Sequence, residues 1–330
     1  MEALRRIYAE EIPAFLREAA AAPCMQRLKD IGMNCGCEYT SFPKFVGINK
    51  YSRYDHSLGV ALIVWRFTHD KAQALAGLLH DVSTPVFAHV IDFLRGDHMT
   101  QEATEDGTAG IIANDEKLQE VLRRYGLTTD DVSDYHRYPV ADNDSPRLSA
   151  DRLEYSLGNM LNYGIRSISD VAEYYRDLTL TENEDGVTEI AFLHSEAAVG
   201  FSQAALDCSK VYVSDEDRYA MQALAELLGS AVKDGVITEA DLGGTEPPLI
   251  AKLTANADYA HRWRDFCAMS AMAVSQGEAE GGTWRKIFAK KRSINPLVAG
   301  LGRVSDLDAS FGKRLNAFIS QSQDYWIKGY

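Results

Sequence analysis

The segment HDVSTPVFAHVID, residues 80–92, contains two histidines and two aspartates among small and apolar residues. Such polar groups are costly to bury unless they are paired or bind a metal. Two further candidates, His56 and Asp151, each lie near one end of an apolar segment with helical periodicity. Three helices could therefore bring two imidazoles and two carboxylates, from His56, His80, Asp81 and Asp151, around one divalent cation. Mixed histidine and carboxylate ligands suit transition metals and differ from the cysteine-rich ligands of structural zinc sites.

The order of these residues along the chain is similar to a known signature. His56, then His80 and Asp81 together, then Asp151 resemble the H…HD…D pattern of the HD-domain phosphohydrolase superfamily. This resemblance implies that the four residues are metal ligands and that the protein hydrolyses a phosphate ester.

Longer segments resemble one particular group within this superfamily. Residues 52–60 (SRYDHSLGV) and 76–92 (AGLLHDVSTPVFAHVID) resemble the deoxynucleoside-triphosphate triphosphohydrolases, the group of the bacterial dGTPases and the SAM-and-HD-domain dNTPase. Residues 27–32 (RLKDIG) also resemble the helix that precedes the first motif in that group. The similarity covers roughly residues 25–235.

The resemblance also implies a catalytic pair. His89 and Asp92 correspond to a histidine and a carboxylate beside the metal, and their i, i+3 spacing places both on one helix face. In such a pair the aspartate orients the imidazole, which acts as a general acid or a nucleophile toward a phosphoryl group.

Four residues correspond to substrate contacts in the resemblance: Arg53, Arg152, Tyr155 and Asn159. A guanidinium suits bidentate binding of phosphate. For Arg53 and Arg152, a salt bridge to a neighbouring aspartate is the alternative interpretation. Asn159 replaces an aspartate of the family pattern.

The chain departs from the family pattern on the substrate side. Thr84 replaces the second histidine of HDLGHGPFSH, and Met33 replaces a glutamine of the sugar pocket. Residues 99–102 (MTQE) replace Trp-x-His-Glu, and residues 212–214 (YVS) replace Tyr-x-His. We therefore expect phosphoester hydrolysis, with weak or absent triphosphohydrolase activity on dNTPs.

The elements that must position these residues are mainly helical. Apolar residues recur at helical spacing near residues 2–21, 24–31, 54–69, 71–80, 86–94, 109–124, 148–164, 194–209, 215–233 and 256–273. Residues 178–192 alternate on both sides of Glu-Asp-Gly, which predicts a β-hairpin, and residues 285–298 are basic and β-like. The expected fold class is an all-α HD-domain helical bundle with a small hairpin and an α+β C-terminal extension. The expected domains are a body over residues 1–235 and an extension over residues 236–330.

Composition excludes some classes of partner. The net charge of −14 makes the chain repel a phosphate backbone, so duplex nucleic acid is not an expected partner. No apolar run approaches the roughly 18–20 residues that span a bilayer, and the N-terminus lacks the apolar core of a signal peptide. We therefore expect a cytoplasmic protein without a membrane partner.

These observations together predict a metal-dependent phosphohydrolase that acts on a nucleotide or a related phosphate ester. Two alternatives stay open: a nucleoside monophosphatase or cyclic-nucleotide phosphodiesterase on the same metal centre, and a non-catalytic nucleotide-binding regulatory module. The expected cofactor is a divalent transition metal (Fe, Mn, Zn, Ni or Co), with Mg²⁺ as an additional candidate. The expected partners are a small phosphorylated substrate and a second copy of the chain in a homo-oligomer.

Overall fold

The structure is a computed structural model that describes residues 1–96, 99, 107–277 and 283–330. The α-helices are α1 (Glu2–Tyr8), α2 (Ala14–Ala20), α3 (Pro23–Arg27), α4 (Arg53–Thr68), α5 (Lys71–Leu79), α6 (Val90–Arg95), α7 (Thr108–Asn114), α8 (Glu116–Arg124), α9 (Thr129–Val132), α10 (Ala150–Asn162), α11 (Ile168–Arg176), α12 (Ser195–Val211), α13 (Asp215–Lys233), α14 (Glu239–Leu242), α15 (Glu246–Ala255), α16 (Ala257–Ala268), α17 (Val304–Leu307) and α18 (Ala309–Ser320). The 3₁₀ helices are η1 (Leu28–Asp30), η2 (Cys37–Tyr39) and η3 (Tyr135–Arg137). The strands are β1 (Leu178–Glu182), β2 (Thr188–Phe192), β3 (Met272–Ser275), β4 (Leu297–Val298), β5 (Gly302–Arg303) and β6 (Trp326–Gly329).

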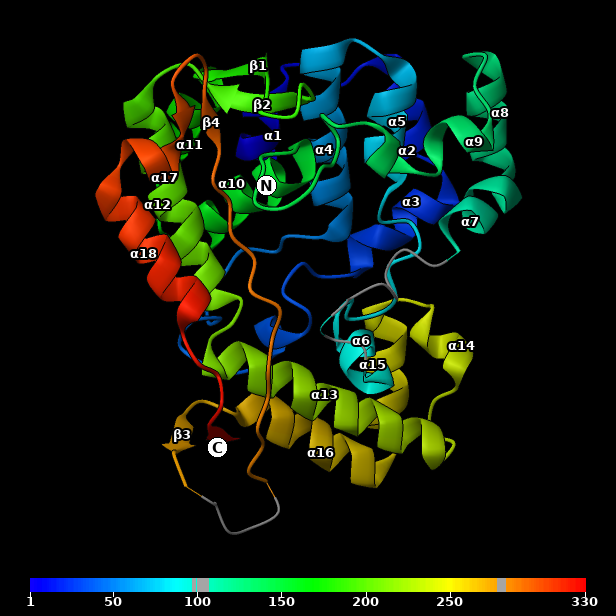
Figure 1. Ribbon diagram of the computed structural model, residues 1–330. Helices are drawn as coiled ribbons and strands as arrows, with labels where there is room; N and C mark the ends of the chain where they lie inside the picture. The colour runs from blue at the N-terminus through cyan, green and yellow to red at the C-terminus, as the bar shows by residue number, and fades with distance from the viewer. Residues whose placement is uncertain (97–98, 100–106, 278–282) are drawn as a thin grey trace.

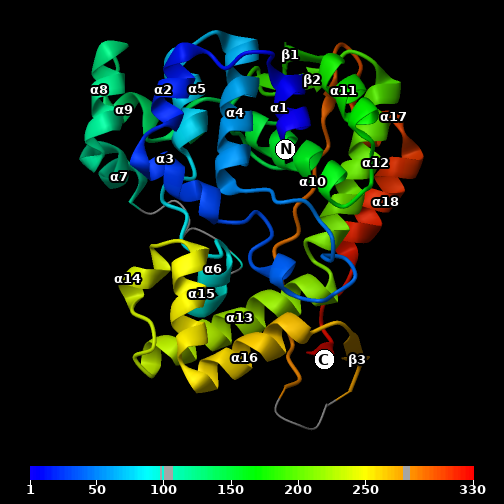
Figure 2. The same ribbon diagram turned by 180° about the vertical axis from the view of Figure 1, so that it is seen from behind.

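Helices α4, α5 and α10 form the centre of the upper part of the molecule (Figure 1). Helix α4 packs against α5, α10 and α1, and α1 lies beside α4 in Figure 2. The turn from α4 to α5 is short because His69 ends α4 in the left-handed region, with φ 50°, and Asp70 caps α5. The Asp70 side chain accepts the backbone N–H groups of Ala72 and Gln73, which otherwise have no partner at a helix start.

The predicted hairpin is confirmed. Strand β1 pairs antiparallel with β2, with Leu178 opposite Phe192. Strand β4 lies parallel to β2, and β5 pairs with β4, so residues near 300 complete the sheet that the hairpin begins. A second sheet joins β3 to β6. The fold is therefore mostly helical with two small sheets, and the prediction of an all-α class overstates its helical character.

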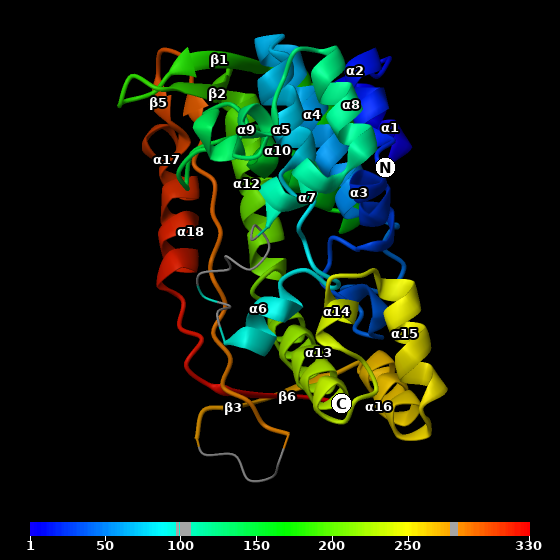
Figure 3. The same cartoon turned by 90° about the vertical axis from the view of Figure 1, so that its right-hand side faces the viewer.

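The lower part of the molecule is built around α13. This helix packs against α6, α16 and β6, and α15 packs against α16 (Figures 1 and 3). Apolar side chains of α6, α13, α15 and α16 share one buried cluster. Contacts therefore cross position 235, both in this cluster and in the sheet, and the division into domains at that position stays a prediction.

Several predicted helices are divided in the structure. Residues 2–21 form α1 and α2, because Pro13 precedes α2 at its N-cap. Residues 109–124 form α7 and α8, separated by Asp115, whose side chain caps α8. Residues 256–273 form α16 and then turn into strand β3. None of the helices in the described part of the chain has the length and apolar character needed to cross a membrane.

Candidate metal centre

His56 lies in the second turn of a helix whose start is encoded locally. Ser52 and Asp55 form a capping box, in which each side chain binds the backbone N–H of the other, and α4 begins at Arg53. His56 is only 2% exposed, and its Nδ1 lies 2.6 Å from Oε2 of Glu154 on α10. This carboxylate also accepts the Tyr51 hydroxyl. Glu154 therefore fixes the ring of His56 with Nε2 turned toward the start of α10.

His80 is oriented by the backbone of its own helix. Its Nδ1 lies 2.8 Å from the carbonyl oxygen of Gly77 in α5. A carbonyl can only accept a hydrogen bond, so Nδ1 carries the proton and Nε2 keeps its lone pair. Metal-binding histidines commonly hold their second nitrogen in this way, by a carboxylate or a carbonyl. Both His56 and His80 thus match that pattern.

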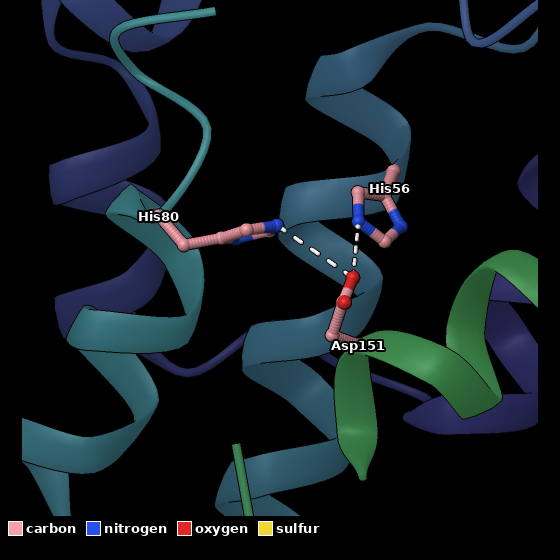
Figure 4. A group of neighbouring side chains, drawn as sticks. All are labelled: His56, His80 and Asp151. Carbon is pink, nitrogen blue, oxygen red and sulfur yellow. Dashed lines mark ion pairs between the residues drawn. The ribbon is translucent and has the colours of Figure 1, made fainter. Parts of the chain in front are cut away.

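Asp151 brings a carboxylate to the two Nε2 atoms. It lies in the first turn of α10, which begins after Ser149, whose hydroxyl accepts the Arg152 N–H at 3.2 Å. Asp151 Oδ1 is 3.0 Å from Nε2 of His56 and 3.8 Å from Nε2 of His80. One ligand atom from each of the three residues lies within 4.8 Å of the others, and the side chains point toward one another from three helical segments (Figure 4).

Asp81 lies beside these three residues, and two further side chains, those of Arg53 and Thr84, hold its carboxylate in place. Its Oδ2 is 4.0 Å from Nε2 of His56 and 3.7 Å from Nε2 of His80. The same carboxylate is bound by Arg53 at 3.1 Å and accepts the Thr84 hydroxyl at 2.9 Å. All four predicted ligands therefore lie at one point of the fold. Thr84, which departs from the family pattern, positions one of them.

The charges at this point favour a cation. Burial opposes a charged His56, but the hydrogen bonds to Asp151 and Glu154 outweigh burial and raise the pKa of His56 to about 10. Burial likewise opposes a charged Asp151, yet the hydrogen bond from His56 lowers the pKa of Asp151 to about 2. The carboxylates thus attract positive charge strongly, and two imidazoles with carboxylate oxygens are donors that divalent transition metals accept. The residues present fit a metal ion.

His89 and Asp92, for which a catalytic role is predicted, are hydrogen-bonded to each other. His89 precedes α6 after a turn in which Phe87 and Ala88 adopt positive φ angles of 56° and 48°. Nδ1 of His89 lies 2.9 Å from Oδ2 of the buried Asp92, and Nε2 lies 3.3 Å from Nη2 of Arg292. A guanidinium only donates, so Nε2 of His89 is an acceptor and Nδ1 carries the proton. Desolvation lowers the pKa of His89 to about 4, with Arg292 and Arg53 acting in the same direction. The imidazole is therefore uncharged at neutral pH, and the predicted role of general acid requires it first to gain a proton.

This pKa predicts a pH dependence of stability. An unfolded chain protonates His89 below about pH 6.5, whereas the folded protein resists protonation until about pH 4. In that interval the unfolded state binds more protons, so the free energy of unfolding falls as the pH is lowered from about 6.5 to 4. We expect His89→Gln to show a shallower decrease over this interval in denaturant titrations. A variant with the same slope as the parent would contradict the assignment.

All four predicted substrate contacts line one cavity of about 410 Å³, together with the metal-site residues and His89. Arg53 binds Asp81, as described, and Arg152 binds Asp142 at 3.1 Å. Both arginines thus form the salt bridges that were the alternative to phosphate contact. Asn159 donates to the Tyr212 hydroxyl at 2.9 Å, while its own Oδ1 is buried and has no hydrogen-bond partner among the described residues. The ring of Tyr155 lies 6.1 Å from that of Tyr212.

Several cavity residues were not singled out from the sequence. These are Asp142, Asp217, His136, Lys290 and Arg292; Glu154, which holds His56 from outside the cavity, was not singled out either. The sequence could have indicated Glu154, because it lies three residues after Asp151 and therefore on the same helix face. His136 is exposed, yet it lies at the cavity, where its Nδ1 is 2.8 Å from Oδ2 of Asp142. Residues 100–102 of the altered family motif lie outside the described residues.

Gly59 allows α10 to approach α4 closely. A Cβ on Gly59 would lie 2.6 Å from Cγ and Oε1 of Glu154. Although alanine favours a helix over glycine by about 1 kcal/mol, we expect Gly59→Ala to destabilise the protein by displacing Glu154 from His56. Metal affinity should fall about 10- to 100-fold, the usual effect of losing a carboxylate that orients a ligand histidine.

The matched control is Gly110→Ala in α7, where no heavy atom of the described chain lies within 4 Å of the added Cβ. Thermal unfolding and metal titration should show this control to be at least as stable as the parent, with equal metal affinity. Equal behaviour of Gly59→Ala and Gly110→Ala would refute the role of Glu154.

The chain is similar to known phosphohydrolases in fold and in sequence. No profile of a known protein family matches the chain. The crystal structure of a phosphohydrolase from Bacteroides thetaiotaomicron superposes with a TM-score of 0.63 at 12% identity, covering 97% of this chain and 96% of that one. This likeness shows a shared fold.

Two relatives are similar in sequence. The metal-dependent phosphohydrolase cns2 of Cordyceps militaris is 25% identical over 238 residues, which are 71% of this chain and 67% of cns2. The uncharacterized protein YdhJ of Bacillus subtilis is 28% identical over 261 residues, 78% of this chain and 76% of YdhJ. The chain is thus similar in sequence to a metal-dependent phosphohydrolase and shares the fold of another phosphohydrolase.

Proposed function

We propose that this protein is an HD-type, metal-dependent phosphohydrolase whose substrate is a nucleotide or a related small phosphate ester. The observation that carries the proposal is the convergence of His56, His80 and Asp151 within 4.8 Å, on a cavity that also holds His89. The similarity to cns2 supports the same class of reaction.

His56, His80, Asp81 and Asp151 would hold the metal. A divalent cation there would supply Lewis-acid stabilisation of the charge that develops on a phosphoryl oxygen. His89 Nε2 acts from the cavity wall as a proton acceptor or nucleophile, and Asp92 keeps its ring and tautomer fixed through the 2.9 Å hydrogen bond to Nδ1. The carboxylate also stabilises the imidazolium that forms when His89 takes up a proton.

The rest of the cavity suits a polar, partly aromatic leaving group. Tyr155, Tyr163 and Tyr212 line it with aromatic rings, and Oδ1 of Asn159, which no described residue hydrogen-bonds, offers an acceptor. A nucleoside provides both a ring that packs on tyrosine and hydroxyl or amino donors. These features support a nucleotide as the substrate.

A single phosphoryl group fits the charge of the cavity better than a triphosphate. Arg53 and Arg152 are each paired with a carboxylate, so the positive charge of each is already offset before a substrate binds. Each phosphate of a polyphosphate chain would add negative charge beside these groups. This observation favours the second candidate, a monophosphatase or a cyclic-nucleotide phosphodiesterase on the same centre.

The experiment that tests the proposal is turnover of a nucleotide panel by protein loaded separately with Mn²⁺, Fe²⁺, Co²⁺, Ni²⁺, Zn²⁺ or Mg²⁺. The panel contains monophosphates, cyclic monophosphates and dNTPs, and the product identifies the bond that is cut. We expect metal-dependent release of inorganic phosphate from a monoester, or opening of a cyclic ester, and little triphosphate from any dNTP. Nucleotide binding without turnover under every metal would support the non-catalytic module instead.

A further inference from the structure

The C-terminal part of the chain contributes an extended, basic segment to the cavity wall. Residues 283–296, here called the strap, run from the lower helices up to β4 (the orange trace of Figure 1) and lie alongside α18 in Figure 3. Five of the eight residues 285–292 are lysine or arginine, in a chain whose net charge is −14. Two of these five residues, Lys290 and Arg292, line the cavity of the candidate active site.

The strap is fixed on both sides of the cavity. Buried Arg218 of α13 donates to the carbonyl of Ile287, and Gln323 accepts the Ala289 N–H at 2.8 Å. Beyond the cavity, the Asn295 N–H donates to the carbonyl of Pro146 at 2.8 Å. These hydrogen bonds to the backbone of the strap hold the intervening residues at a set distance from the site. The strap can thus present side chains to a ligand without first having to be ordered.

Arg292 is the strap residue nearest to the proposed chemistry. Its Nη2 lies 3.3 Å from Nε2 of His89, and both Arg292 and Lys290 line the cavity. The other cavity arginines, Arg53 and Arg152, are bound to Asp81 and Asp142. A phosphoryl group that approaches His89 Nε2 must therefore pass within reach of the Arg292 guanidinium.

We infer that Arg292 is a phosphate-binding residue of this site, supplied by the C-terminal strap. The inference rests on the proposed function, because it names the group that would recognise the phosphoryl part of the substrate. A guanidinium binds phosphate through two parallel hydrogen bonds. On binding, Arg292 exchanges its bond to His89 for bonds to phosphate oxygens, which frees Nε2 for its reaction. The site is then incomplete without residues 283–296.

The test measures binding of inorganic phosphate to the metal-loaded full-length protein by calorimetry, alongside turnover of the best substrate. We expect Arg292→Gln to weaken phosphate binding about 10- to 100-fold, as loss of charge-assisted hydrogen bonds does. Arg292→Lys, which keeps the charge but loses the planar fork, should recover part of the affinity. In turnover, KM should rise more than kcat falls.

The matched control is Arg285→Gln, on the same strap. Arg285 pairs with Glu226 at 2.8 Å and does not line the cavity, so this variant should bind phosphate like the parent. Metal content and melting temperature of each variant show that the fold is kept.

The outcomes separate this inference from the proposed function. If the parent hydrolyses no ester but binds phosphate in an Arg292-dependent way, the inference holds and the proposed function fails. If Arg292→Gln binds phosphate as tightly as the parent and Arg285→Gln, the inference is wrong whatever the turnover. A metal-loaded parent that binds no phosphate also overturns it.

Discussion

His80→Ala is expected to abolish both metal binding and turnover. Its Nε2 is one of the atoms that converge within 4.8 Å, and its Nδ1 is fixed by the Gly77 carbonyl. Alanine removes one neutral donor and leaves His56, Asp81 and Asp151 as an incomplete ligand set. Metal content should therefore fall from about one ion per chain to background, because affinity depends on the full set of ligands.

The control for this prediction is His69→Asn. His69 and Asp70 form the second His-Asp dipeptide of the sequence, besides His80 and Asp81. His69 ends α4 with φ 50°, a conformation that asparagine also tolerates, and it lies outside the cavity. This variant should keep the metal content and turnover of the parent. A His80→Ala protein that still holds about one ion per chain after chelation and reloading would show that His80 is not a ligand.

His89→Ala, in contrast, should keep the full metal content and lose most of its turnover. His89 binds Asp92 and Arg292 rather than the residues of the metal group. Removing a positioned acid or base commonly reduces turnover about 10²- to 10⁴-fold. Asp92→Asn, which keeps the shape but removes the charge that stabilises the imidazolium, should reduce kcat by less.

The alternative to this role is a partly exposed ion pair of little consequence for rate or stability. The two interpretations differ when metal content and turnover are measured on the same preparations. Parent-like turnover in His89→Ala would support the ion pair and exclude the catalytic role.

The helices that carry the metal site were predictable because their signals are local. Ser52 and Ser149 cap α4 and α10, and apolar periodicity defines the bodies of α4 and α5. The hairpin followed from alternation on both sides of a turn at Gly186. The order of the histidines and aspartates then indicated which helix ends had to meet.

The position of the strap could not be predicted from local signals. The same is true of the residues that hold His56 and His89 by hydrogen bonds from distant parts of the chain. Glu154 contacts His56 across 98 positions of the chain, and Arg292 contacts His89 across 203. Such contacts depend on tertiary packing, which neither propensity nor spacing encodes. The cluster of basic residues in 285–292 stands out in an acidic chain. The neighbouring residues, however, do not indicate which part of the fold this cluster would face.

The proposed metal centre is tested most directly by anomalous scattering from a crystal of the protein grown with Mn²⁺. We expect one strong peak between His56 Nε2, His80 Nε2 and Asp151 Oδ1, at about 2.0–2.2 Å from each ligand atom, which is the usual distance from imidazole and carboxylate donors to a transition metal. Asp81 should lie beside the same peak. The absence of a peak at this point, or a peak held by other residues, would contradict the proposed metal centre.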